Sequence, residues 1–308
     1  MSPYLQEISC FLGQDQVFDR ASETAEKLMG VKLCDRAIDR VSHHYGGVLE
    51  ELTQTEIEEG IPTIPIIADS PNYVMIDGGM VFTREQRWME MKLARIFPAS
   101  AHLSIHEKRN WVKESKYVAH LGEHKFFLPK VEQYTDQIRN LIFVCDGARW
   151  IWKWVEDNYP DSIQILDFYH AKEHLCEFAV EFFSSKASRS DWIDLQSKLL
   201  MEDKVEEVMD NIRQLPENRA DKIEKLKQEL LGYYSKNAHR MKYKTYKEKG
   251  LMIGSGPIEA AHRHVIQQRF KLSGQRWTIR GAQQIANLRT AEKSNQWEKV
   301  VGLIKNVA

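Results

Sequence analysis

The amino-acid sequence predicts an α/β fold with a mixed sheet, because short apolar runs typical of buried strands alternate with segments of helical spacing. Two runs in the middle of the chain carry this prediction. Leu141–Cys145 and Ile163–Leu166 are five residues or fewer, contain β-branched residues, and each is followed at once by an aspartate, Asp146 or Asp167. Between them, apolar residues recur every four positions, which is helical spacing. We expect both aspartates at strand ends, where open α/β sheets bind ligands.

The composition of the chain is that of an ordinary globular protein. With 308 residues, of which 43% are hydrophobic and 28% charged, it can bury a full core and form two or three units. The sequence contains no apolar run long enough for a membrane span, and its first residues do not resemble a secretory signal. Its four cysteines lack the close spacing of zinc ligands, which favours reduced thiols. We therefore expect a cytoplasmic protein without a membrane partner.

The first region, residues 1–62, is predicted to be helical. Pro3 stands where helices begin, Gly30 stands where they end, and Asp35 is a candidate cap for the next helix. Two helices around a glycine-containing turn permit a helix-turn-helix. The start of the second helix carries two aspartates against two arginines, however, which favours plain helical packing over contact with phosphates. Prolines in residues 61–67 mark the expected boundary.

The next region, residues 63–175, is predicted to hold the strands of the sheet. The run 73–82 contains Asp77 and two glycines, which indicates a strand that turns into a hairpin. The run 88–97 alternates between apolar and polar residues and predicts a strand with one solvated face. Two further elements are expected before the central segment: a strand at residues 115–122 and a short helix at residues 126–134.

Helical spacing dominates the remainder of the chain. Residues 176–251 show helical stripes and no strand pattern, so we expect an all-helical insertion. Residues 252–308 then return to the core with a Gly-Ser-Gly-Pro turn and a helix whose first turn contains Glu259. A purely structural role for Glu259 is an alternative, because the helix dipole favours an acidic residue in the first turn.

Charge is concentrated in one segment, although the formal net charge of the chain is only −1. Between Lys236 and Arg280 there are eleven lysines and arginines against two acidic residues, and aromatic residues are interleaved with them. This pattern is typical of a surface that binds nucleic acid, with phosphates on the cations and bases on the rings. The predicted DNA-binding residues are Arg263, Arg269, Lys271, Arg276, Trp277 and Arg280. As alternatives, some of these cations are simply solvated, and Trp277 packs under the helix of Glu259.

Three carboxylates separated in the sequence suggest metal chemistry. If Asp77, Asp146 and Glu259 converge, their charges repel one another unless a cation joins them. Carboxylate oxygens select Mg²⁺ or Mn²⁺. Two such ions roughly 4 Å apart can support an in-line displacement at phosphorus. The neighbouring basic segment would bind the phosphodiester.

The sequence resembles bacterial insertion-sequence transposases of the DDE type, most closely the Kra-type group. The resemblance rests on Asp77 in YVMIDGG, Asp146 in FVCDGARWIW and Glu259 in IGSGPIEAAHRHVIQQRFKLSGQRW, with spacings of 69 and 113 residues, and it spans most of residues 1–288. It implies an RNase H-like core in which these three residues are the metal-binding catalytic triad. Asp167 and His170 match an Asp-x-x-His signature of transposases with helical insertions, which implies that they support the site.

The function implied by the resemblance is cleavage of transposon ends followed by joining of the freed 3′-hydroxyl to target DNA. We expect DNA as the partner, a homo-oligomer assembled on it, and association with the bacterial nucleoid when bound. Members of this group usually extend further at the amino end. One alternative is therefore a truncated or catalytically lost transposase-derived DNA-binding protein. The other is a related metal-dependent nuclease that cuts DNA without joining it.

Overall fold

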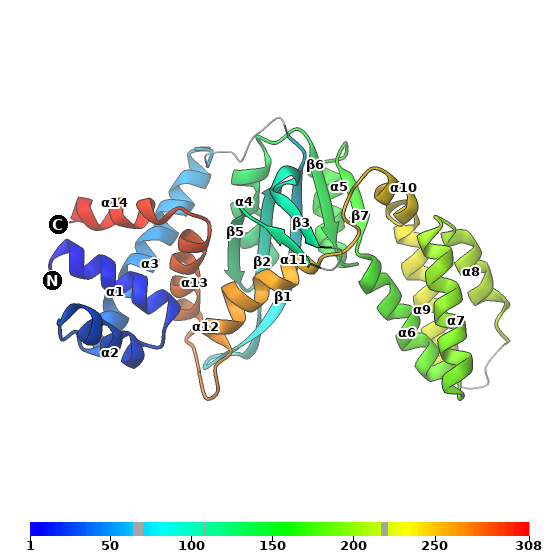
Figure 1. Cartoon of the computed structure of the whole chain (residues 1–308), viewed down its shortest axis with the longest axis horizontal. Coiled ribbons are helices and arrows are strands. Elements are labelled where there is room, and N and C mark those ends of the chain that lie inside the picture. Colours follow the sequence, from blue (N-terminus) through cyan, green and yellow to red (C-terminus); the bar gives the residue numbers. More distant parts are fainter. Residues whose placement is uncertain (64–69, 107–108, 217–220, 308) are drawn as a thin grey trace. The chain divides into compact units, whose positions relative to one another are not determined.

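The structure is a computed structural model that describes residues 1–63, 70–106, 109–216 and 221–307 (Figure 1). It confirms the α/β prediction, because the described residues form helices, a five-stranded mixed sheet with the strand order β5-β2-β1-β6-β7 and a two-stranded sheet of β3 and β4. The chain divides into two compact units. Unit 1 comprises residues 1–141 and 256–308, and unit 2 comprises residues 142–255. The boundary expected at residues 61–67 adjoins residues 64–69, which lie outside the described ranges.

Unit 1 contains most of the strands and both ends of the described chain. Its strands are β1 (Asn72–Thr83), β2 (Arg87–Pro98), β3 (His102–His106), β4 (Arg109–Val112) and β5 (Lys116–Leu121). Its helices are α1 (Pro3–Asp15), α2 (Phe18–Met29), α3 (Asp35–Glu58), α4 (His124–Thr135), α11 (Gly256–Ala261), α12 (Gln268–Phe270), α13 (Ile279–Lys293) and α14 (Trp297–Val307), with a 3₁₀ turn at Ala99–Ala101. A π-helical stretch, His262–Gln267, joins α11 to α12.

Unit 2 consists of a parallel strand pair followed by helices. Its strands are β6 (Leu141–Cys145), whose first residue belongs to unit 1, and β7 (Ile163–Leu166). Its helices are α5 (Arg149–Asn158), α6 (Phe168–Phe182), α7 (Lys186–Met201), α8 (Val205–Gln214), α9 (Asp221–Asn237) and α10 (Tyr243–Glu248), with a 3₁₀ turn at Ala238–Arg240. The predicted strand, helix and strand around Asp146 and Asp167 are thus confirmed. The helices predicted for residues 176–251 are also present in the described part of that range.

The amino-terminal helices form as the end signals predict. Pro3 is the first residue of α1, and the Ser2 side chain accepts a hydrogen bond from a backbone N–H in its first turn. Gly30 ends α2 with a φ of 69°, a left-handed conformation that glycine adopts without strain. Asp35 is the first residue of α3 and not its cap, which is Cys34. The helix then continues to Glu58, through the acidic stretch.

The core of the helical end of unit 1 joins segments that are distant in sequence. Tyr45 and Leu49 of α3 pack with Leu288 of α13 and with Val300 and Ile304 of α14. Burying each such side chain contributes roughly 1.5–3 kcal/mol. Helix α13 also packs against β5, so the amino-terminal helices and the sheet share one scaffold within unit 1.

The three antiparallel strands of unit 1 form the platform of the candidate site. Asp77 of β1 pairs with Leu93 of β2, and β2 pairs in turn with β5. The prediction of a solvated face along 88–97 is wrong for the part from Met91 onward, where every residue is buried. Helices α4 and α11 both pack against β2, which explains the burial. The polar members of this part, Lys92 and Arg95, are buried with hydrogen-bond partners.

Candidate functional site

Asp77 lies in the middle of β1, and its side chain is 37% exposed. Its Oδ1 accepts a hydrogen bond from the backbone N–H of Gly78 at 2.7 Å, and its Oδ2 lies 3.7 Å from Nε2 of His262. Burial lowers the pKa of His262, and the nearby Asp77 carboxylate opposes this shift. Among the described residues, no donor lies within hydrogen-bond distance of Oδ2, so this oxygen can accept a cation or a proton donor from a ligand.

The two glycines after Asp77 make room for its neighbours. A Cβ at Gly78 would collide with the Glu90 carboxylate, and a Cβ at Gly79 would lie only 3.0 Å from Nδ1 of His262. The predicted strand and hairpin are confirmed: β1 runs through both glycines to Thr83, and the chain turns at residues 84–86 into β2. The glycines therefore allow an acidic side chain and an imidazole to lie against the strand beside Asp77.

Glu259 lies in the first turn of α11, as predicted, and its side chain is exposed. Two contacts hold this turn on the sheet. Ile258 is fully buried, and the buried Arg95 of β2 donates a hydrogen bond from Nη1 to the carbonyl oxygen of Pro257 at 2.7 Å. Among the described residues, no cation lies within ion-pair distance of Glu259. Helix α11 packs against β1 and β2, so the helix of Glu259 and the strand of Asp77 are in contact within unit 1.

Asp146 follows β6 directly, in unit 2. Its Oδ1 accepts a hydrogen bond from the backbone N–H of Ala148 at 2.9 Å, and its backbone oxygen accepts one from Nε1 of Trp152 at 2.6 Å. These bonds fix the turn between β6 and α5. Tyr233 lies against this turn, where a Cβ at Gly147 would be 2.9 Å from its hydroxyl oxygen. Burial, with the charges of Asp146 and Asp167, raises the pKa of Tyr233.

The two supporting residues predicted by resemblance have different surroundings in unit 2. Asp167 is 2% exposed and caps α6, because its Oδ1 accepts hydrogen bonds from two backbone N–H groups of the first turn, at 2.6 and 3.1 Å. Its Oδ2 accepts from the backbone and hydroxyl of Ser255. Its oxygens therefore already accept four hydrogen bonds. His170 is 40% exposed, and its ring lies 5.2 Å from that of His174.

Each unit thus brings part of the predicted site together. In unit 1, the helix of Glu259 packs against the strand of Asp77. Unit 2 holds Asp146 and Asp167 at the same end of two parallel strands, because the preceding residues, Cys145 and Leu166, are paired in register. Within the described residues there is no cluster of three His, Cys, Asp or Glu side chains able to hold a metal ion. The convergence of all three carboxylates stays a prediction, with oxygen donors of the type that suits Mg²⁺ or Mn²⁺.

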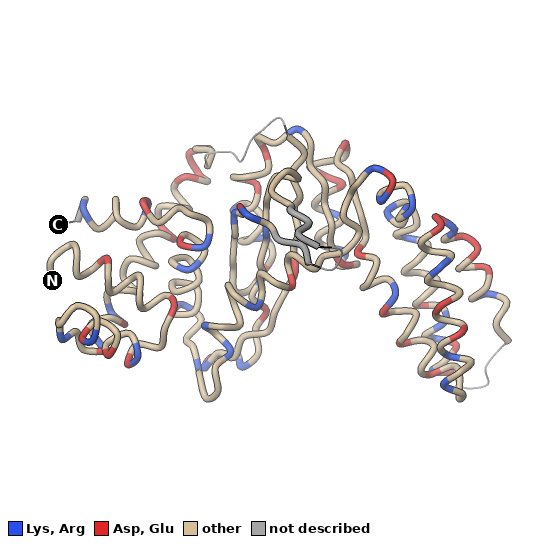
Figure 2. Tube along the Cα trace, viewed as in Figure 1, with Lys and Arg blue, Asp and Glu red and all other residues tan. Residues whose placement is uncertain are grey.

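The predicted DNA-binding residues separate into exposed and buried groups within unit 1. Figure 2 shows Lys and Arg on the loop that follows α12 and on the β1–β2 hairpin. The exposed residues are Arg263, Lys271, Arg276 and Arg280. By contrast, Arg269 is 1% and Trp277 8% exposed. The Arg269 guanidinium lies 4.7 Å from the centre of the Trp277 ring, which also packs against Phe270 at 5.1 Å. Trp277 thus packs at the end of the helix that begins near Glu259.

A basic groove lies in unit 2 between α5 and α9, and it was not anticipated from the sequence. It has a volume of about 920 Å³ and begins at Gly147, next to Asp146. Its cationic lining residues are Arg149, Lys153, Lys225, Lys236 and Arg240, against the acidic Glu156 and Glu229. Arg240 is bonded to Glu156, and Lys225 lies 3.7 Å from Glu229. Among the described residues, the other three cations have no carboxylate within ion-pair distance, which suits a polyanion.

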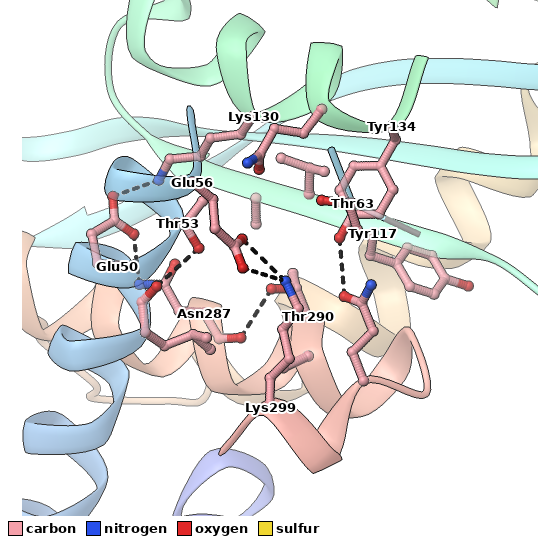
Figure 3. A pocket seen from close by; sticks show the side chains of 16 residues that line it. Glu50, Thr53, Glu56, Thr63, Tyr117, Lys130, Tyr134, Asn287, Thr290 and Lys299 are labelled. Atoms are coloured by element: carbon pink, nitrogen blue, oxygen red, sulfur yellow. Dashed lines mark hydrogen bonds and ion pairs between the residues drawn. The ribbon is translucent and has the colours of Figure 1, made fainter. Parts of the chain in front are cut away.

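A second cavity, in unit 1, is too small for a substrate and is lined by hydrogen-bonded polar side chains from several helices (Figure 3). Its volume is about 60 Å³, enough for a few water molecules. Glu50 accepts hydrogen bonds from Lys130 at 2.5 Å and from Asn287 at 2.7 Å, which connects α3 to α4 and α13. Lys299 of α14 donates to both carboxylate oxygens of Glu56 at 3.1 Å. These bonds satisfy charges that burial would otherwise penalise.

Sequence reasoning missed three features of these sites. His262 was passed over, although it follows Glu259 by about one helical turn and therefore lies on the same side of the helix. Tyr233 gave no signal, because only the fold brings its ring beside Asp146. The groove cations Arg149 and Lys153 stand four apart on a predicted helix, a spacing that places them on one face. That spacing was the available signal, hidden by the larger basic segment nearby.

The comparisons with known proteins leave the family open. The chain matches no protein-family model, and no curated protein matches it significantly. Among the helices of the described ranges, none combines the length and the apolar character that crossing a membrane requires.

Proposed function

We propose that this chain is a DNA transposase of the DDE type, which cleaves the ends of a mobile element and joins them to target DNA. The observation that carries the proposal is that, in unit 1, the helix of Glu259 packs on the strand of Asp77, and Nε2 of His262 lies 3.7 Å from Oδ2 of Asp77. The strand carries Asp77 and the helix carries Glu259. Among the described residues, His262 is the only ion-pair partner of Asp77, and Glu259 has none. Such donors suit a hard divalent cation.

Asp146 is the third proposed ligand. It follows a buried parallel strand, the position at which open α/β sheets hold ligands. Its turn is fixed by hydrogen bonds to Ala148 and Trp152, so its carboxylate is oriented before a ligand arrives. Bound Mg²⁺ would supply charge stabilisation for in-line displacement at phosphorus. Asp77, Asp146 and Glu259 would orient that ion, and a fixed orientation is itself a large part of such catalysis.

Asp167 has a positioning role in this proposal. Its four accepted hydrogen bonds hold the start of α6 and Ser255, which immediately precedes the segment of Glu259 in the sequence. The basic groove supplies the second requirement of the function, a surface for DNA phosphates that begins next to Asp146.

The test of the proposal uses DNA taken from the regions that flank the gene. The purified chain is incubated with Mg²⁺ and a duplex that ends in a pre-cleaved 3′-hydroxyl, together with a circular target. Joined product is the expected result. Nicking without joining, under the same conditions, would instead identify a metal-dependent nuclease, and stable binding without either reaction would identify a DNA-binding protein that has lost its chemistry.

A DNA-binding function without catalysis is the second candidate, and the groove favours it specifically. The groove cations require no metal and no intact triad to attract DNA. A variant with Asp77→Asn separates the two candidates, because Oδ1 of asparagine can still accept the hydrogen bond of Gly78. The transposase proposal predicts that this variant binds DNA and joins none.

A further inference from the structure

A pocket in unit 1, lined by none of the three carboxylates, has the features of a ligand site. Its volume is about 380 Å³, within the range of small-molecule sites. Its walls come from α2, α3, the β1–β2 turn and the loop that leads into α13. The lining residues that matter chemically are Phe18, Arg84, Arg269, Gln275, Arg276 and Trp277.

The inner wall of the pocket carries a buried cation whose nearest carboxylates, Asp15 and Asp39, are not in direct contact with it. Arg269 is 1% exposed, and both Nε and Nη2 donate to the same acceptor, the backbone oxygen of Gly13, at 3.2 and 3.1 Å. Its guanidinium lies between the rings of Phe18 and Trp277, at 5.1 and 4.7 Å. Among the described residues, no carboxylate lies within ion-pair distance of it, and burial lowers its pKa to about 10. A buried charge without a counter-ion is costly, so an anion in the pocket would be stabilised.

Three further polar atoms of the pocket lack partners among the described residues, and one of them is Nδ1 of His43. The indole Nε1 of Trp277, a residue 8% exposed, and the side-chain oxygen of Gln275 are both buried with no hydrogen bond to the described residues. Native proteins rarely leave such atoms unsatisfied, because each loses its hydration on burial. The indole N–H is a donor and the Gln275 oxygen is an acceptor. A ligand with an adjacent acceptor and donor would satisfy both.

The rim of the pocket is cationic. Arg84 and Arg276 are both exposed, and Nε of Arg84 donates to the backbone oxygen of Arg276 at 3.0 Å, which holds the two residues together. In the described ranges neither has a carboxylate within ion-pair distance. The acidic residue of the lining, Asp39, lies 2.9 Å from His43, and burial lowers the pKa of that histidine. The two arginines of the rim therefore outnumber the one carboxylate of the lining. Paired guanidinium groups are well suited to phosphate.

We propose that this pocket binds one nucleotide of a DNA strand. The phosphate lies at the rim between Arg84 and Arg276, in the field of Arg269. The base enters against the Trp277 ring and satisfies the indole N–H and the Gln275 oxygen, because the edge of a base presents donors and acceptors side by side. The inference rests on the proposed function in one respect, that DNA is the substrate. It adds a nucleotide site whose lining includes none of Asp77, Asp146 and Glu259.

Isothermal titration of the full chain, without divalent metal, tests the proposal. The probes are the four 2′-deoxynucleoside 5′-monophosphates, the corresponding nucleosides, inorganic phosphate and a short single-stranded oligodeoxynucleotide. We expect at least one monophosphate to bind about tenfold or more tightly than its nucleoside and than inorganic phosphate, a difference of about 1.4 kcal/mol. The oligodeoxynucleotide should compete with it. Absence of nucleotide binding, or equal binding of inorganic phosphate, would overturn the nucleotide site.

Variants assign the binding to the pocket. The double variant Arg84→Gln with Arg276→Gln should weaken nucleotide binding about tenfold or more. Trp277→Phe keeps a ring but removes the unpartnered N–H, so its binding should weaken while its thermal midpoint stays near that of the wild type. Arg36→Gln, an exposed charge loss on α3 outside the pocket, is the matched control and should bind normally. Unchanged binding in the double variant would contradict the assignment.

The outcome for the pocket is distinguishable from that for the catalytic proposal. Asp146→Asn should bind the nucleotide as the wild type does, because Asp146 does not line the pocket. A chain that binds nucleotide but cleaves no DNA would keep the pocket and reject the transposase. A chain that cleaves DNA but binds no nucleotide would reject the pocket alone. Nucleotide binding with which the oligodeoxynucleotide does not compete would overturn the DNA strand as the source.

Discussion

The basic groove of unit 2 makes a quantitative prediction about the salt dependence of DNA binding. Lys153 and Lys236 line the groove, are exposed, and have no carboxylate within ion-pair distance among the described residues. Each is therefore free to neutralise one phosphate and release a counter-ion. On duplex DNA each such contact contributes about 0.9 to the slope of log affinity against log salt. Replacing both by glutamine should reduce the slope by about 1.8.

This difference is large enough to measure by fluorescence polarisation of a labelled duplex without divalent metal. Between about 50 and about 200 mM salt, the wild type should lose about tenfold more affinity than the Lys153→Gln, Lys236→Gln variant. The matched control replaces Lys186 and Lys198, which are exposed in unit 2 but outside the groove. The control should keep the wild-type slope. Equal slopes for the groove variant and the control would refute the assignment of the groove to DNA.

Two further predictions concern stability. Arg289 is fully buried and donates hydrogen bonds to Asp15 at 2.9 Å and to the backbone oxygen of Val265 at 2.6 Å. Arg289→Met should therefore cost at least about 1–3 kcal/mol in urea unfolding, because the buried carbonyl oxygen of Val265 loses its donor, and a loss below that of the exposed control Arg280→Met would contradict this. Burial lowers the pKa of His120 from 6.5 to about 4, so the folded state resists its protonation. Stability should fall by about 2 kcal/mol from pH 7 to pH 5, and His120→Gln should remove that part of the loss; an unchanged pH dependence would refute it.

The strands and helices that have strong local signals could be predicted from the sequence. The run 141–145 is apolar and buried throughout, the run 163–166 ends in two buried apolar residues, and an aspartate follows each, as expected of parallel strands in a sheet interior. The end of α2 at Gly30 follows from the left-handed conformation that this residue adopts. Such features depend on neighbours in the chain, so the sequence alone contains the necessary information.

Features that depend on tertiary contacts could not be predicted in this way. Gly78 and Gly79 suggest a turn by composition, yet they lie within β1, where they pair with β2, and the Glu90 carboxylate and the His262 ring occupy the space of a side chain. Residue type likewise does not report burial. Arg269 is a cation in a basic segment, but its aromatic neighbours and the carbonyl of Gly13 retain it in the interior.

The candidate site likewise combines residues that could be predicted from the sequence with residues that could not. The aspartates at positions 146 and 167 and the glutamate in the first turn of α11 were placed on their elements from sequence. His262 and Tyr233 reach Asp77 and the Asp146 turn only through packing of distant segments. Hydrophobic periodicity does not predict which helix covers which strand. That packing determines which side chains become neighbours of the candidate carboxylates.

The measurement that tests the central claim most directly is DNA cleavage by Asp146→Asn in Mg²⁺, with the flanking DNA of the gene as substrate. Asparagine can keep the hydrogen bond from Ala148, so the turn should fold normally while a carboxylate is lost. The account predicts that strand cleavage is abolished and that DNA affinity stays within a few-fold of the wild type. Cleavage by this variant at the wild-type rate would contradict the assignment of the three carboxylates to one metal site.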